Sequence, residues 1–214
     1  MKICIISDVH NKFNKITIPE CDLLISCGDY SFLGETHEVR NFHKWLNKQK
    51  ADNMISVQGN HEKGVEKDFN LSKEIAVAHC PKVHFIDEGF LEIKGYKIWC
   101  SAVTPYFCNW AWNRFRGEDI KKHWDRIPLD IDILVTHGPP YGILDTVSTH
   151  SPIRNLGCEM LANKIKELKN LKLHCFGHIH SSYGSTEKDG VTYINASICT
   201  EEYKPLNAPM FFEL

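Results

Sequence analysis

Seven side chains of types that bind metal ions occur along the chain, each soon after a short apolar run. They comprise two aspartates, one asparagine and four histidines: Asp8, His10, Asp29, Asn60, His137, His178 and His180. Carboxylate, amide and imidazole ligands together suit Mn, Zn, Fe or Co better than Ca or a hydrated Mg ion. These residue types therefore predict a site for divalent transition metals, with magnesium the poorer match.

The apolar runs have the length and composition of buried β-strands. We expect strands at residues 3–7, 23–26, 54–57, 131–135, 171–176, 191–195 and 210–213, and a hairpin between residues 90 and 100. We expect helices at residues 36–50, 118–124 and 155–169, and a long loop at 104–117. Strands that alternate with helices predict an α/β fold with a mainly parallel sheet and mixed pairing toward its end.

The position of the seven side chains relative to these strands indicates what they can do together. In open α/β sheets, ligands bind in the crevice beyond the carboxyl ends of the strands. Five of the predicted strands are followed by at least one of the seven residues. The sequence therefore predicts one shared metal cluster at a single edge of the fold.

Length and composition indicate an ordinary globular protein. The chain has 214 residues with no linker or internal repeat, which predicts one domain over residues 1–214. Its formal net charge of −2 gives no broad attraction to nucleic acid or acidic membranes, so extended nucleic-acid binding is not expected. No run approaches the roughly 18 apolar residues that a membrane span needs.

The nine cysteines do not form a recognisable disulfide framework. Their number is odd, no Cys-x-x-Cys pair occurs, and Cys4, Cys27, Cys100 and Cys175 lie in or beside apolar runs. We expect reduced, packed thiols and hence a cytoplasmic protein. A zinc-thiolate site is the alternative, although the paired spacing typical of such sites is missing.

Each polar motif is weak when taken alone, because Asp-x-His is often a capping pair and Gly-Asp is often a turn. As an ordered set, they resemble the motifs of the calcineurin-like metallophosphoesterases. The stretches that carry the resemblance are Ser7-Asp8-Val9-His10-Asn11, Gly28-Asp29, Gly59-Asn60-His61-Glu62, Thr136-His137-Gly138-Pro139-Pro140 and Phe176-Gly177-His178-Ile179-His180. Trp110-Ala111-Trp112-Asn113 and Asn195-Ala196-Ser197-Ile198-Cys199 resemble the branch of small metallophosphoesterase-domain-containing proteins that includes the vertebrate fetal-brain forms.

The resemblance extends over residues 3 to about 213 and implies a four-layer α-β-β-α sandwich with two mixed sheets. It also implies two metal ions. One would be held by Asp8, His10 and His180, the other by Asn60, His137 and His178, and Asp29 would bridge the two.

The same resemblance implies a phosphoester hydrolase in which a metal-bound hydroxide attacks phosphorus. Asp29, Asn60 and His61 would be its catalytic residues, with His61 in the position of the acid that protonates the leaving oxygen. Imidazole suits this role because it titrates near neutral pH. The alternative is that His61 only hydrogen-bonds a metal-bound water or a ligand.

Residues 104–117 are the predicted substrate-binding loop. Trp110, Trp112 and Phe115 could stack on a base, and Arg114 or Arg116 could pair with a phosphate. The alternative is that the tryptophans close a small satellite core and the arginines face solvent.

We expect a small phosphodiester as substrate, with cyclic and other small nucleotides as candidates. A phosphomonoesterase and a nuclease of the same superfamily are alternatives, as is a non-catalytic scaffold protein. The scaffold is disfavoured because all seven ligand positions are filled. The sequence does not predict the oligomeric state.

Overall fold

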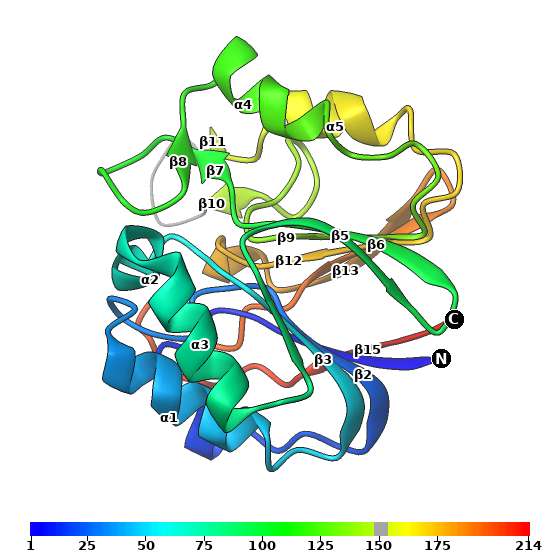
Figure 1. Cartoon of the computed structure of the whole chain (residues 1–214). Coiled ribbons are helices and arrows are strands. Elements are labelled where there is room, and N and C mark those ends of the chain that lie inside the picture. The colour runs from blue at the N-terminus through cyan, green and yellow to red at the C-terminus, as the bar shows by residue number, and fades with distance from the viewer. Residues whose placement is uncertain (148–153) are drawn as a thin grey trace.

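The computed structural model describes residues 1–147 and 154–214. Two β-sheets pack face to face, and helices cover both outer faces of the pair (Figure 1). The helices α1 (Thr36–Leu46) and α3 (Phe69–His79) lie outside the first sheet, and α4 (Glu118–Trp124) and α5 (Glu159–Ile165) lie outside the second. The predicted α/β class and four-layer α-β-β-α arrangement are confirmed.

The first sheet has five strands in the order β15-β1-β2-β3-β4. Its strands are β1 (Lys2–Ile6), β2 (Cys21–Ser26), β3 (Ala51–Val57), β4 (Val83–Ile86) and β15 (Met210–Glu213). Strands β1 to β4 are parallel, and β15 pairs with β1 in the antiparallel sense. All four parallel strands therefore end at the same edge of the sheet.

The second sheet has six strands in the order β13-β14-β12-β9-β6-β5. Its strands are β5 (Glu88–Ile93), β6 (Tyr96–Ser101), β9 (Ile133–Thr136), β12 (Leu173–Phe176), β13 (Gly184–Lys188) and β14 (Val191–Asn195). The four central strands are parallel, and both edge strands are antiparallel to their neighbours. The pairing is mixed, as expected.

The alternation of side chains along the four central strands of the second sheet separates two apolar layers. In β9, Ile133 and Val135 belong to the core between the sheets, whereas Leu134 packs in the layer beneath α4 and α5. Trp99 of β6 and Phe176 of β12 also belong to this outer layer. Successive side chains of a strand point to opposite faces, so a strand covered on both sides is apolar throughout.

The helices differ from the sequence expectation in length and number. The helix expected at 36–50 ends at Leu46, and its N-cap is Glu35, in a capping box with Glu38. The helix expected at 155–169 covers only Glu159–Ile165. It starts late because Arg154–Asn155 forms the short strand β11 against β10 (Thr146–Val147).

Two further helices, α2 (Lys63–Lys67) and α3, were not predicted. The buried residues of α3 are the small Ser72 and Ala76, while Leu71 and Val77 are exposed. The segment therefore lacks the apolar stripe by which an amphipathic helix is recognised in a sequence.

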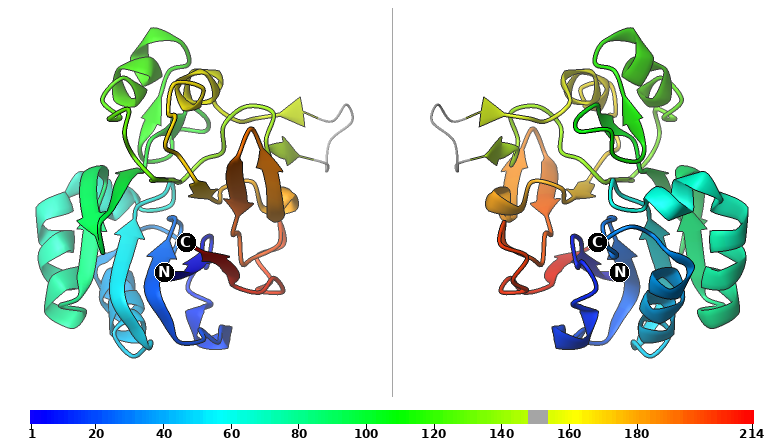
Figure 2. Two further views of the ribbon diagram at one scale, coloured as in Figure 1. Left: turned by 90° about the vertical axis from the view of Figure 1, so that its right-hand side faces the viewer. Right: turned by 90° about the vertical axis from the view of Figure 1, so that its left-hand side faces the viewer.

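The remaining elements are short. The 104–117 loop contains a two-residue parallel ladder between β7 (Thr104–Pro105) and β8 (Asn113–Arg114). Single turns of 3₁₀ helix occur as η1 (Phe13–Lys15) and η2 (His180–Ser182). The two termini lie side by side, and the Met1 ammonium donates to the Leu214 carbonyl (Figure 2). Within the described ranges, no helix has the length and apolar character that crossing a membrane would require.

A buried histidine in α1 makes stability depend on pH. The His43 Nδ1–H donates to the Val39 carbonyl at 2.7 Å, and Nε2 lies 3.3 Å from the Ser56 hydroxyl. Burial lowers the pKa of His43 from 6.5 to about 4. Between these two pH values the unfolded chain binds a proton that the folded chain does not, so stability falls as the pH falls through this window.

We predict that His43→Gln reduces the loss of unfolding free energy between pH 7 and pH 5 by about 2 kcal/mol. Urea unfolding of the wild-type and variant proteins at both pH values measures this difference. His37→Gln, which replaces an exposed histidine of the same helix, is the control. A variant with the full wild-type dependence would contradict the prediction.

Candidate metal centre

The two sheets are joined at the edge where their parallel strands end. The Ser7 N–H donates to the Ala196 carbonyl at 2.9 Å, and the Ile198 N–H donates to the Ser7 carbonyl at 2.8 Å. This parallel bridge connects the chain after β1 with the chain after β14. The carboxyl ends of both sheets therefore meet along one line, which is where ligands collect in open α/β folds.

All seven residues predicted as metal ligands follow strands at this junction. Asp8 and His10 follow β1, Asp29 follows β2, Asn60 follows β3, His137 follows β9, and His178 and His180 follow β12. Three overlapping groups of side chains lie within ligand distance of one another: Asp8, His10 and His180; His10, Asp29 and His61; and Asp29, His137 and His178. The structure thus brings together residues up to 172 positions apart, from Asp8 to His180 (180 − 8).

The backbone is strained at four of the seven positions. The φ angles of Asp8, His10, Asp29 and His178 are 53°, 43°, 53° and 69°. Non-glycine residues rarely adopt this left-handed region, and it costs on the order of 1 kcal/mol or more per residue. The strain concentrates at sharp turns that direct the side chains into the junction, as is common at functional sites.

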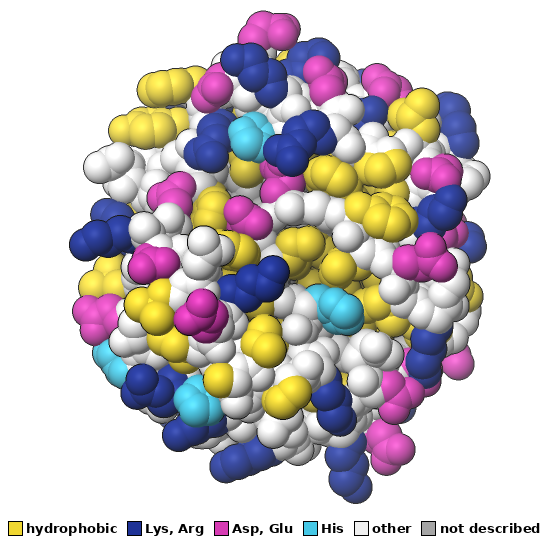
Figure 3. Space-filling model, viewed as in Figure 1, with side chains coloured by type: hydrophobic (Ala, Val, Ile, Leu, Met, Phe, Trp, Pro, Cys, Tyr) yellow, Lys and Arg dark blue, Asp and Glu magenta, His cyan; other side chains and the backbone are white. Residues whose placement is uncertain are grey.

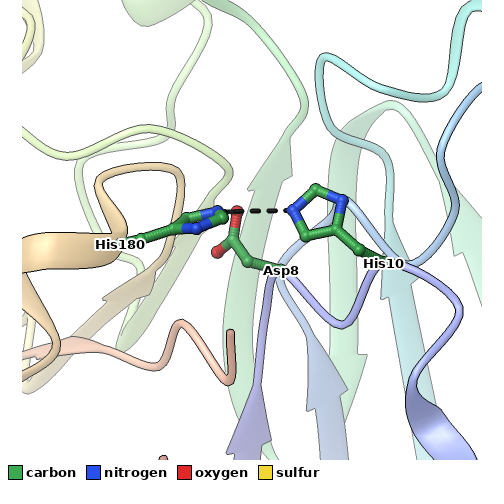
Figure 4. A group of neighbouring side chains, drawn as sticks. All are labelled: Asp8, His10 and His180. Atoms are coloured by element: carbon green, nitrogen blue, oxygen red, sulfur yellow. Dashed lines mark hydrogen bonds and ion pairs between the residues drawn. The ribbon is translucent and has the colours of Figure 1, made fainter. Parts of the chain in front are cut away.

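The first half of the centre contains Asp8, His10 and His180, whose side chains point toward a common point (Figure 4). The Nε2 atoms of His10 and His180 are 3.3 Å apart, and Asp8 Oδ1 is 3.2 Å from His180 Nε2. Each ring donates its Nδ1–H to a backbone carbonyl, His10 to Ser31 at 3.2 Å and His180 to Thr200 at 3.0 Å. Both Nε2 atoms therefore remain free to bind a cation.

One carboxylate oxygen of Asp8 indicates that a cation binds at this point. Asp8 Oδ1 is buried and makes no hydrogen bond within the described part of the chain, although His180 Nε2 lies 3.2 Å from it. The other oxygen, Oδ2, accepts hydrogen bonds from the Ser197 hydroxyl at 2.8 Å and the His178 N–H at 2.9 Å. A buried carboxylate oxygen without a partner is costly, and a metal ion would satisfy it.

The second half of the centre contains Asp29, Asn60, His137 and His178. His137 Nε2 lies 2.8 Å from Asn60 Oδ1 and 3.4 Å from Asp29 Oδ2, and its Nδ1–H donates to the Cys27 carbonyl at 2.8 Å. Asp29 also belongs to the group that contains His10. Its carboxylate thus lies between the two halves, where a bridging ligand would have to be.

Protonated histidines balance the charges of the carboxylates at the centre, and bound metal ions could supply the same positive charge. Burial lowers the pKa of His180 and of His137, but the neighbouring Asp8 and Asp29 carboxylates more than offset this and raise both pKa values to about 9. The pKa values of Asp8 and Asp29 are lowered despite burial, mainly by the same histidines. The carboxylates therefore require positive charge beside them, which either protons or divalent cations can supply.

Two glycines let the backbone approach these carboxylates. A Cβ on Gly177 would lie 2.0 Å from Asp8 Oδ2, and one on Gly59 would lie 2.4 Å from Asp29 Oδ1. No side chain can be tolerated at such distances without displacing the carboxylate. These positions require glycine for space.

Sequence reasoning missed Glu62, which is fully buried behind the centre. Its carboxylate accepts hydrogen bonds from the N–H groups of Asp29, Ser31 and Gly59 at 2.9, 3.0 and 2.7 Å, and from the Ser31 hydroxyl at 2.7 Å. Glu62 therefore ties the turn after β2 to the turn after β3. The sequence signal is its place in the Gly59-Asn60-His61-Glu62 motif, which does not distinguish this role from that of a helix cap.

His61 lies beside the bridging carboxylate. Its N–H donates to Asp29 Oδ1 at 2.8 Å, and its ring Nδ1–H donates to the Phe32 carbonyl at 2.9 Å. The remaining nitrogen, Nε2, lies 4.0 Å from Asp29 Oδ2. His61 can therefore present Nε2 to a group bound at the centre.

A cavity of about 350 Å³ opens onto the centre. It is lined by Asp29, Asn60, His61, Phe107, Trp110, His178, His180, Glu201 and Tyr203. Phe107 and Tyr203 were not singled out from the sequence. Tyr203 comes from the turn after β14, far from the predicted substrate loop, and its ring centre lies 4.8 Å from that of His10.

The residues predicted to bind substrate are separated by the structure. Trp110 lines the cavity, whereas Trp112 is 7% exposed and packs in the core between the sheets. Arg114 donates to His123 and to the Asn113 carbonyl. Arg116 donates to the carbonyls of residues 156 and 157 and pairs with Glu159.

Both arginines therefore contact the second sheet's helical layer, and their guanidinium groups are already paired there. Phe115 is 65% exposed and stacks on Tyr106. The alternative for this loop is a small satellite core closed by the tryptophans, with the arginines facing solvent. Trp112 is buried, but in the core between the sheets, and both arginines are paired. This alternative also does not fit Trp110.

Comparison with known proteins agrees with this geometry. Residues 1–182 match the family model described as calcineurin-like phosphoesterase. The chain belongs to the calcineurin-like phosphoesterase family. It is 33% identical over 231 aligned residues to metallophosphoesterase domain-containing protein 1 of human and mouse, covering 99% of this chain and 70% of theirs.

Solved structures share the fold at low sequence identity. A phosphopantetheinyl hydrolase from Mycobacterium tuberculosis has a TM-score of 0.60 and 17% identity, covering 94% of this chain and 90% of that one. A dimetal phosphatase from Danio rerio has a TM-score of 0.55 and 10% identity, covering 99% and 91%. Family membership supports a metal-dependent phosphoester hydrolase, and the three overlapping His/Asp groups fit a dinuclear metal site.

We predict that Gly177→Ala weakens metal binding by about tenfold to a hundredfold, because the added methyl group displaces Asp8 Oδ2 from its hydrogen bonds to Ser197 and His178. Competition with a chromogenic chelator measures the affinity. Gly190→Ala is the control, since this glycine has a φ of +77° but nothing within 4 Å of an added Cβ. Unchanged affinity in a folded Gly177→Ala protein would refute the steric argument.

Proposed function

We propose that the protein hydrolyses small phosphodiesters, with nucleotides among the candidate substrates. The observation that carries this proposal is the lining of the cavity. Its described lining contains no lysine or arginine, and Phe107 and Tyr203 offer apolar surface to a substrate. A monoester dianion needs more positive charge than a diester monoanion, whereas the second organic arm of a diester needs apolar surface.

The chain's own residues have separate roles in this proposal. Asp8, His10 and His180 would hold one metal ion, Asn60, His137 and His178 the other, and Asp29 would bridge them. When bound, the metal ions would act as Lewis acids and lower the pKa of a water molecule. His61 would hold a proton on Nε2, the atom left free by the bond to Phe32, and give it to the leaving oxygen.

The mixture of imidazole, carboxylate and amide groups favours Mn, Zn, Fe or Co over Mg in both halves of the centre. We also propose a cytoplasmic location and a small-molecule phosphoester as partner. All nine cysteines are free thiols, and eight of them are buried, which suits a reducing compartment.

The alternatives differ in their surface requirements. A nuclease needs a continuous basic surface for the phosphate backbone, whereas lysine and arginine side chains are interspersed with acidic ones on the face shown in Figure 3. A phosphomonoesterase would use the same metal centre and is distinguished by its substrate preference. A non-catalytic scaffold is disfavoured because all seven ligand positions converge.

The first prediction for this function concerns metal dependence and substrate class. Metal-stripped protein should regain activity with Mn, Zn or Fe more readily than with Mg. It should hydrolyse methyl 4-nitrophenyl phosphate in preference to 4-nitrophenyl phosphate, which has the same leaving group. Release of nitrophenolate measures both.

The control for this assay is His137→Ala, which removes a predicted ligand and should abolish metal-restored turnover. Preference for the monoester would overturn the diester proposal but keep the metal centre. Binding of two metal ions without turnover of either compound would favour the scaffold.

A second prediction concerns His61. His61→Ala should lower the turnover of phenyl methyl phosphate by about 10²-fold, and that of methyl 4-nitrophenyl phosphate much less. The reason is that nitrophenolate is stable enough to leave without a proton. His79→Ala, in α3 away from the centre, is the control. Equal losses for both substrates would count against the acid role.

A further inference from the structure

The indole of Trp110 stacks on the imidazole of His61. Their ring centres are 4.4 Å apart and the ring planes differ by 27°. This is a close, nearly parallel contact between two flat side chains. Trp110 thus contacts the proposed acid itself.

Three contacts together fix the orientation of the His61 ring. Its Nδ1–H donates to the Phe32 carbonyl at 2.9 Å, and the His10 ring lies 4.6 Å away at an interplanar angle of 74°. Trp110 is the flat surface that restricts rotation of the ring. The result is that Nε2 faces the Asp29 carboxylate at 4.0 Å.

Trp110 is itself held firmly by its neighbours in the loop. The Ala111 N–H donates to the Asn60 carbonyl at 3.1 Å, and the Trp112 N–H donates to Glu66 Oε1 at 2.9 Å. The Trp112 side chain is buried in the core between the sheets. The Trp112 side chain therefore anchors this stretch in the core, and the Ala111 N–H binds the carbonyl of the residue before His61. The Trp110 side chain is left to contact His61.

The indole is only partly exposed, and His61 already stacks on it. One part of the ring system is covered by His61, and the Lys63 Nζ lies 5.6 Å from the ring centre. A base that stacked on Trp110 would compete with these contacts. The geometry therefore favours a role toward His61 over the role of a base-stacking platform.

We propose that Trp110 is a positioning residue that holds the His61 imidazole with Nε2 directed at the leaving oxygen. This proposal rests on the proposed function, in which His61 is the acid. Removal of the indole would let the ring rotate about its side-chain bonds. A displaced acid would slow the step in which a poor leaving group departs, without weakening substrate binding.

The test combines kinetics with a spectroscopic measurement. Trp110→Ala should lower kcat for phenyl methyl phosphate by about tenfold to a hundredfold, change it much less for methyl 4-nitrophenyl phosphate, and leave KM nearly unchanged. Trp110→Phe should retain most of the activity, because a flat ring remains. Tyr106→Ala, in the same loop but stacked on Phe115, is the matched control.

A double-mutant cycle separates positioning from an independent role. In a His61→Ala background, Trp110→Ala should cause no further loss. Independent losses that multiply in the double variant would overturn the proposal, and so would an increase in KM with kcat unchanged, which indicates substrate stacking.

The spectroscopic arm does not depend on turnover. The indole shifts the NMR resonance of the His61 Cε1–H through its ring current, and that resonance is assigned by its loss in His61→Ala. Trp110→Ala should move the resonance and Tyr106→Ala should not, whereas an unmoved resonance would overturn the proposal. Absence of turnover in the wild-type protein would overturn the proposed function and, with it, the role of Trp110 in turnover. If the wild-type protein is active but the losses caused by Trp110→Ala and His61→Ala multiply in the double variant, only the proposed role of Trp110 is overturned.

Discussion

The structure depends on a cluster of buried polar groups at its metal centre. These groups repel one another unless a proton or a cation lies between them. Asp8 Oδ1 and the Nε2 atoms of His10 and His180 lie within about 3.3 Å of a neighbour in the group, and without a proton or a cation between them each would direct a lone pair inward. Backbone carbonyls already use the Nδ1–H of both rings. Only protons or cations can stabilise this arrangement, so the ordering of the strand ends and the binding of metal ions are coupled.

The surrounding fold supports this arrangement by joining the carboxyl ends of two sheets. The Ser7–Ser197 bridge connects the sheets, and Glu62 connects the turns after β2 and β3. Left-handed backbone at Asp8 and Asp29 then directs their carboxylates inward, and Gly59 and Gly177 leave space for them. These features act on different turns of the same centre. The backbone strain at Asp8 and Asp29 is therefore offset by the hydrogen bonds of the bridge and of Glu62.

Much of the centre could be predicted from the sequence because its order along the chain repeats one simple pattern. A buried strand followed by a polar residue at a turn fixes both the sheet edge and the side chain, as for Asp29 after β2 and His137 after β9. The contributions of Glu62, Ser197 and Tyr203 could not be predicted, since they depend on contacts between distant segments. The roles of Trp110 and Trp112 could not be told apart, because an irregular loop has no periodicity that distinguishes a buried side chain from one that faces the cavity.

The neighbouring termini have a consequence for how the protein can be handled. Strand β1 begins next to Met1 and runs toward the metal centre, so both ends of the chain lie at the opposite edge of the first sheet (Figure 2). A five-residue strand spans about 17 Å. An affinity handle or fluorescent fusion at either end would thus project away from the cavity. A short peptide could also link the two ends, so that new termini could be opened in an exposed turn such as Asp189–Gly190.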